Sequence, residues 1–106
     1  MAKTPKAPLN ADTLLLAKRI RQFRESLGLS RPKFADILDV PPTTLKNYEL
    51  GYRTTGSEFL IEIGKKYGAS VVLWMMGLPS TFTVPAKDSS EGEREVFRRK
   101  YMAQAA

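Results

Sequence analysis

Apolar residues recur at helical spacing in two short stretches near the middle of the chain, at Phe34, Ile37 and Leu38 and then at Leu45 and Tyr48. Ser30 precedes the first stretch as a good N-cap, and Gly51 follows the second as a C-cap. Between them, Pro41 forces Val40 into an extended conformation, because the proline ring disfavours a helical residue before it. The pattern therefore predicts two short helices joined by a tight turn, which we call the helix-turn-helix segment (residues 30–51).

Four polar residues lie on the outward side of the second predicted helix: Thr43, Thr44, Lys46 and Asn47. Asparagine can bond adenine through two atoms, lysine can donate to guanine, and a threonine methyl group can touch the thymine methyl group. A solvated helix face without a ligand would have a similar composition. It is the whole helix-turn-helix pattern that makes these four residues predicted readers of base edges.

Helical spacing continues on both sides of this segment. Residues 12–27 form a predicted helix, which Asn10 or Asp12 could cap and which Gly28 terminates. Ser57 is predicted to cap a helix that ends near residue 67. Residues 70–76 form a short fifth helix that is apolar almost all round, more than one side of a small bundle can bury. We expect part of it to stay exposed unless a second subunit covers it.

After Gly77 the helical period is lost. Thr81–Val84 alternates like a strand, and it would either pair with its own copy in a dimer or lie extended over the bundle. Ser90 and Glu93 form a capping box that opens a last helix, which would pack on its own domain or on a partner, or be disordered. The predicted organisation is a disordered basic arm (1–10), a domain (11–77), and a C-terminal extension (78–106) that could take part in dimerisation.

Composition narrows the function further. The chain has 106 residues, a net charge of +6, and neither cysteine nor histidine. Disulfides are excluded, and no metal, cofactor or small-molecule ligand is expected. We see no glycine-rich phosphate loop and no carboxylate pair in a predictable cleft, so no enzyme is predicted. The sequence has no apolar run of membrane-span length and no signal-peptide core, which predicts a cytoplasmic protein without a membrane partner. The net positive charge is compatible with binding to nucleic acid.

Several positions in and around the helix-turn-helix segment resemble the Cro/C1-type (XRE) helix-turn-helix family of phage and bacterial regulators: Gly28-Leu29-Ser30, Phe34-Ala35, Ile37, Val40, Leu45 and Tyr48-Glu49-Leu50-Gly51. The resemblance extends over roughly residues 12–77. It implies an all-α, five-helix DNA-binding bundle whose third helix enters the major groove, here followed by the C-terminal extension with a possible short strand and helix.

The chain departs from the family pattern at three positions. Asp39 stands at a turn position usually held by glycine, and its short polar side chain can tolerate a left-handed conformation. Arg31 and Pro42 stand where the family often has glutamine. Because Pro42 has no hydrogen-bonding side chain, base reading is expected to fall on the four outward residues of the same helix.

The resemblance also implies roles for other residues. Arg24 and Glu49 are expected to form a structural ion pair between the first helix and the end of the third. Tyr52 and Arg53, in the loop that follows, are expected to hold a backbone phosphate. Arg31 is also a predicted phosphate contact, because a cation in the first turn of a helix is mildly unfavourable until an anion joins it.

We therefore predict a sequence-specific regulator of transcription that binds double-stranded DNA. It would act as a repressor by occupying promoter DNA, as a homodimer on a near-palindromic operator. One alternative is the DNA-binding antitoxin of a toxin–antitoxin pair, whose C-terminal segment would hold the toxin. Another is a protein-interaction module that keeps the fold without binding DNA. Such a module should show acidic or apolar residues on the outward face of the second helix of the segment.

Overall fold

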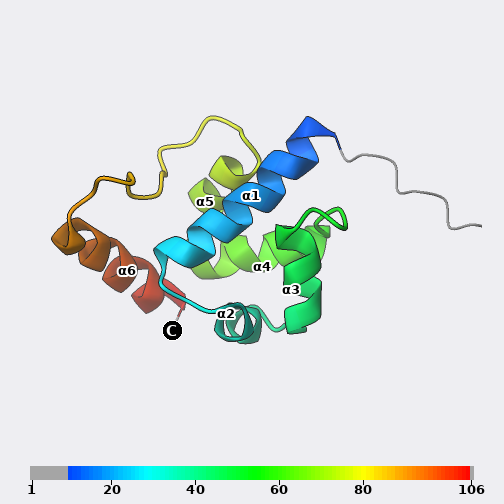
Figure 1. The fold of residues 1–106 in the computed structure, drawn as a ribbon, viewed down its shortest axis with the longest axis horizontal. Coiled ribbons are helices and arrows are strands. Elements are labelled where there is room, and N and C mark those ends of the chain that lie inside the picture. Colours follow the sequence, from blue (N-terminus) through cyan, green and yellow to red (C-terminus); the bar gives the residue numbers. More distant parts are fainter. Residues whose placement is uncertain (1–9, 106) are drawn as a thin grey trace, which may run out of the picture.

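Six α-helices and no strand make up residues 10–105, the part of the chain that the computed structural model describes (Figure 1). In chain order they are α1 (Ala11–Ser26), α2 (Arg31–Ile37), α3 (Pro42–Glu49), α4 (Ser57–Tyr67), α5 (Ala69–Met75) and α6 (Glu91–Ala105). The first five form the bundle and α6 packs against it, so the predicted all-α class is confirmed. Nine of the ten residues of the predicted basic arm lie outside the described residues.

The core is built around α1. Asn10 starts this helix, because its side-chain oxygen accepts the backbone N–H of Thr13 at 2.8 Å. Phe23, fully buried in α1, lies edge-on to Tyr67 of α4 at a centroid distance of 4.9 Å, and it also contacts Phe34 of α2 at 6.1 Å. One aromatic side chain therefore joins three helices of the bundle.

The helix-turn-helix segment follows the local chemistry of its residues. Ser30 caps α2 through a hydrogen bond from Lys33 N to its hydroxyl oxygen at 3.3 Å. Asp39 adopts the left-handed conformation, with a φ of 58°, as its place in the turn predicts. Pro41 is extended and gives α3 no side-chain cap. With the turn fixed in this way, α2 and α3 pack against each other.

The starts of α4 and α5 both differ from the predicted positions. The prediction that Ser57 caps α4 is wrong, because Gly56 occupies the cap position and Ser57 is the first helical residue. Gly56 lies so close to α3 that a Cβ atom there would be 3.2 Å from the Tyr48 hydroxyl oxygen. The cap residue of α4 therefore packs closely against α3. The fifth helix begins and ends one residue before the predicted range.

The possible short strand at Thr81–Val84 does not form among the described residues. This segment lies extended over the bundle, which was the second expectation, and no ladder forms among the described residues. Its inward residue, Phe82, is only 7% exposed and meets Trp74 at a centroid distance of 5.3 Å. The Ser80 hydroxyl fixes the approach by accepting the N–H of Phe82 at 3.1 Å and donating to the carbonyl of Ser70 at 2.6 Å.

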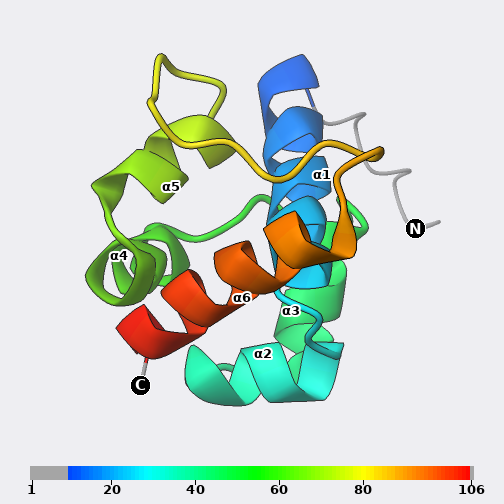
Figure 2. The same ribbon diagram turned by 90° about the vertical axis from the view of Figure 1, so that its left-hand side faces the viewer.

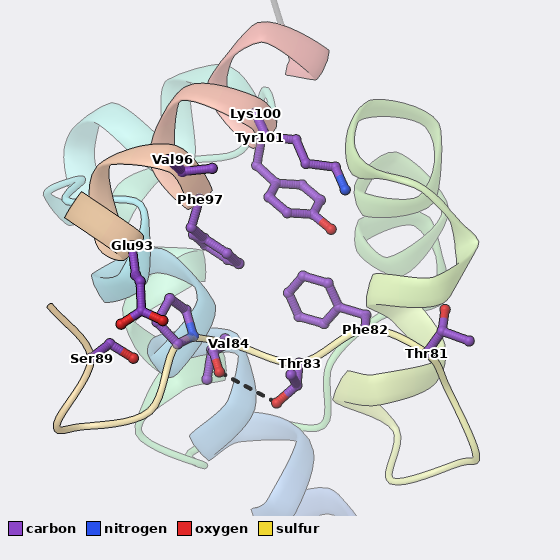
Figure 3. Close-up of a pocket in the computed structure, with 11 residues that line it drawn as sticks. Thr81, Phe82, Thr83, Val84, Ser89, Glu93, Val96, Phe97, Lys100 and Tyr101 are labelled. Atoms are coloured by element: carbon purple, nitrogen blue, oxygen red, sulfur yellow. Dashed lines mark hydrogen bonds between the residues drawn. The ribbon is translucent and has the colours of Figure 1, made fainter. Parts of the chain in front are cut away.

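The last helix, α6, packs on its own domain and lies across the bundle beside α1 and α4 (Figure 2). Its capping box forms as predicted: Glu93 accepts the N–H of Ser90 at 2.9 Å, and the Ser90 hydroxyl accepts the N–H of Glu93 at 3.1 Å. Phe97 and Tyr101 of this helix point toward Phe82, as Figure 3 shows. No residue of α6 is fully buried, and the helix is held by partly buried apolar side chains: Phe97, Tyr101, Met102 and Ala105.

Candidate nucleic-acid interface

The outer side of α3 carries the four residues predicted to read bases. Thr43 and Lys46 are exposed, while Thr44 and Asn47 are half-buried. The opposite side of the helix is anchored by Leu45, which is fully buried. Helix α3 thus has one face in the core and one polar face available to a partner.

The loop after α3 turns back at once toward that helix. Gly51 has a φ of 73°, and the N–H of Tyr52 donates to the carbonyl of Asn47 at 2.9 Å. The guanidinium of Arg53 lies 5.9 Å from the ring centroid of Tyr48, in a cation–π contact. Tyr52 is 52% exposed and Arg53 is exposed as well. The two loop residues predicted to hold phosphate are therefore accessible beside the outer face of α3.

A buried carboxylate ties the helix-turn-helix segment to α1. The side chain of Glu49, the last residue of α3, is fully buried. Arg24 donates to it twice, from Nε to Oε2 at 2.7 Å and from Nη2 to Oε1 at 3.0 Å. The third nitrogen of Arg24, Nη1, donates to the carbonyl of Leu29 at 2.8 Å. This two-pronged geometry is the strongest form of a guanidinium–carboxylate pair.

Arg31 is the third member of this cluster. Its Nε donates to Glu49 Oε1 at 3.0 Å, and its side chain keeps 30% exposure. The first residue of α2 is thereby joined to the last residue of α3. Two guanidinium groups share one carboxylate, so the cluster carries a net charge of +1 at the edge of the helix-turn-helix segment.

A comparison with protein-family models matched the helix-turn-helix model over residues 20–74, more than half of the chain. The chain belongs to the Cro/C1-type helix-turn-helix (XRE) family. This family is one of DNA-binding transcription regulators and is typically non-enzymatic. No curated protein and no solved structure matched the chain.

The bond from Arg31 to Glu49 was missed from sequence, although the same family resemblance predicted the contact between Arg24 and Glu49. The family often has glutamine at the Arg31 position, and glutamine cannot form an ion pair. The available signal was the position itself, since Ser30 as N-cap places Arg31 at the start of α2, beside the loop that Arg24 also reaches.

Among the hollows outside the α3 face of this helix-turn-helix protein, two are relevant to a partner. One, of about 360 Å³, lies between residues 81–85 and α6 and has Phe82, Phe97 and Tyr101 in its wall (Figure 3). The other, of about 310 Å³, lies between α4 and α5 and is lined only by apolar residues and glycine: Leu60, Ile61, Gly64, Ala69, Val72, Leu73 and Met76.

Part of α5 is exposed at this second hollow, as expected from the sequence. Leu73 is 38% exposed and Met76 is 42% exposed, whereas Val71 and Met75 are buried. Across residues 10–105, no helix is both long and apolar enough to cross a membrane. The same residues hold no group of three acidic side chains arranged to bind a metal ion.

Proposed function

We propose that this protein is a sequence-specific regulator that binds double-stranded DNA in the cytoplasm and reads it with α3. The observation that carries the proposal is the two-sided construction of this helix. Leu45 and Tyr48 fix it in the core, and its four outward side chains all have groups that can address base edges.

Cations flank the α3 face and suit the DNA backbone. Arg31 stands at the start of α2, and Arg53 stands in the loop after α3. Between Lys18 and Lys66, ten Lys and Arg residues stand against six Asp and Glu residues. Base contacts specify a sequence while phosphate contacts position the protein, so the two groups of side chains have separate tasks. Tyr52 joins the phosphate group, as the family resemblance implies.

Selection of binding sites from random duplex DNA tests this proposal. We expect enrichment of one near-palindromic sequence, bound more tightly than a scrambled duplex of the same length and salt concentration. A pool without enrichment, together with equal affinity for both duplexes, would overturn sequence-specific binding.

We further propose that the protein is a homodimer that represses by occupying promoter DNA. Two copies would place their α3 helices in successive major grooves, about 34 Å apart. Support comes from the apolar hollow between α4 and α5, where Ile61, Leu73 and Met76 are each more than one third exposed. Phe82, by contrast, is used within its own chain, so α5 is the better dimerisation surface.

Sedimentation at tens of micromolar tests the dimer. The parent protein should sediment at twice the 11.9 kDa chain mass, and Leu73→Asp should sediment as a monomer. Val96→Asp is the matched control, because Val96 is an exposed apolar residue of α6 outside this hollow. A parent protein that stays monomeric with and without DNA would overturn the dimer.

Of the two alternatives, the protein-interaction module is not favoured, because none of the four outward residues of α3 is acidic or strongly apolar. The DNA-binding antitoxin has one observation in its favour, the aromatic hollow beside α6 that could take an apolar side chain of a toxin. An antitoxin would rescue the growth of cells that express the neighbouring gene product, and Tyr101→Ala would weaken rescue while operator binding is kept. Absence of rescue by the parent protein removes this alternative.

A further inference from the structure

We propose that Glu49 has a second role besides pairing with Arg24: it is the positioning residue that holds the guanidinium of Arg31 ready to bind a phosphate of the DNA backbone. This inference rests on the proposed function and deepens it. It names a residue that would not touch DNA but would set how one DNA contact is made.

The geometry divides the donors of Arg31 into two sets. Its Nε is occupied by Glu49 Oε1 at 3.0 Å. Its two terminal nitrogens, Nη1 and Nη2, have no acceptor within residues 10–105. A guanidinium is planar, so a bond at Nε restricts the direction of both terminal nitrogens. These are the nitrogens that can donate to a phosphate in the two-pronged manner.

Burial makes Glu49 a firm support. Its side chain is fully buried, and Arg24, only 11% exposed, fixes both carboxylate oxygens. The carboxylate therefore cannot follow Arg31 into solvent. Arg31 remains 30% exposed, so it is anchored at one end and accessible at the other.

Charge balance keeps the cluster attractive to an anion. Arg24 already neutralises the single charge of Glu49, which leaves the charge of Arg31 for a phosphate. The Nε bond also reduces the side-chain entropy that Arg31 would otherwise lose on binding DNA. An arginine can make both contacts at once, whereas the compact ammonium of a lysine cannot keep the same fork.

Two substitutions of Arg31 separate positioning from charge. Arg31→Lys keeps the charge, so the slope of log affinity against log salt should stay unchanged while affinity falls about tenfold on operator and scrambled duplex alike. Arg31→Ala loses the phosphate contact itself, so the slope should also become shallower by about 0.9. An Arg31→Lys protein that binds as the parent does would overturn the inference, because charge alone would then suffice.

The order of the side chain can be measured in the free protein by the ¹⁵N–¹H nuclear Overhauser effect at arginine Nε. Arg99 is the comparator, since its side chain is 77% exposed and its closest carboxylate contact is 3.5 Å long. Arg31 should give a value close to that of the backbone, and Arg99 a much lower one. In Glu49→Gln the Arg31 value should fall toward that of Arg99. Should Glu49→Gln fail to fold, the parent values and Arg31→Lys decide the matter.

The outcomes distinguish this inference from the function on which it rests. If the parent protein binds DNA but its Arg31 Nε is as mobile as that of Arg99, positioning by Glu49 is wrong and DNA binding stands. If the parent protein binds neither selected nor scrambled duplex, both the proposed function and the inference are overturned.

Discussion

The helix-turn-helix segment (30–51) and the described part of the C-terminal extension (78–105) are stabilised by different contacts. The segment is fixed by a side-chain cap at Ser30, a left-handed residue at Asp39 and the buried carboxylate of Glu49. The extension is held by aromatic rings, and its helix α6 has no fully buried residue. Both regions pack aromatic rings against Phe23 of α1, and in the segment the two-pronged pair from Arg24 to Glu49 adds a buried, directional polar contact to that packing.

This difference suits the proposed tasks. A DNA-reading helix needs side chains held within a fraction of an ångström, and a buried ion cluster supplies that order. The extension needs only to cover Phe23 of α1 with its own aromatic rings. Phe23 is the meeting point of both regions, since its ring contacts Phe34 on one side and Phe82, Phe97 and Tyr101 on the other.

The largest effect is expected where the two regions meet. Phe23→Ala should cost about 3–5 kcal/mol in the free energy of unfolding, because it leaves a cavity shared by the segment and the extension. Urea unfolding followed by circular dichroism measures the loss. Leu14→Ala, at a half-exposed position of the same helix, should change stability by less than about 0.5 kcal/mol. Equal effects of the two substitutions would contradict a shared aromatic core.

Removing a contact that stabilises only the helix-turn-helix segment should lower the stability somewhat less. Arg24→Ala leaves Glu49 with Arg31 as its one remaining partner among the described residues. It should cost about 1–3 kcal/mol in the free energy of unfolding. Thermal unfolding at neutral pH and low salt is the measurement. Arg21→Ala is the control, since its pair with Glu25 is half-exposed on both sides and should leave the midpoint unchanged. An unchanged midpoint for Arg24→Ala would show that the cluster does not stabilise the fold.

Within the proposed DNA interface, a substitution at a base-reading residue and one at a phosphate-binding residue should have different effects on affinity. Asn47→Ala should cost about 1–3 kcal/mol on the selected operator and little on scrambled duplex, with discrimination lost at one base position. Arg53→Ala should weaken both duplexes alike and reduce the salt slope by about one. Titrations at several salt concentrations decide between the two patterns. If Asn47→Ala weakens both duplexes equally, α3 does not read the sequence.

How far the sequence predicts this structure depends on how local each determinant is. The Ser30 cap, the left-handed Asp39 and the Ser90 capping box depend on neighbours within four residues, and the structure has all three. The start of α4 was mispredicted: Gly56, which packs closely against Tyr48 of another helix, takes the cap position in place of Ser57. The sequence also left open whether Thr81–Val84 pairs as a strand or lies over the bundle, since Phe82 finds its partners in α1, α5 and α6.

The same distinction applies to the candidate site. The outward residues of α3 follow from helical periodicity, and Thr43 and Lys46 are exposed, whereas Thr44 and Asn47 are half-buried. The bond between Arg31 and Glu49 joins residues of two different helices, and no spacing rule predicts it. Such contacts require the packed structure, because they depend on where two helix ends meet.

The smallest effect is expected at Tyr67, within the core that both regions share. Its hydroxyl is buried and has no hydrogen-bond partner within residues 10–105, and burial raises its pKa from 10.0 to about 12. The unfolded chain therefore loses this proton at lower pH than the folded protein, so stability should fall as pH rises from 10 to 12. Tyr67→Phe removes an unsatisfied polar group and should raise stability at neutral pH by about 1 kcal/mol or less. It should also flatten the alkaline decline. Urea unfolding at pH values from 7 to 12 measures both effects, and an unchanged decline in Tyr67→Phe would mean that the hydroxyl is hydrated in solution.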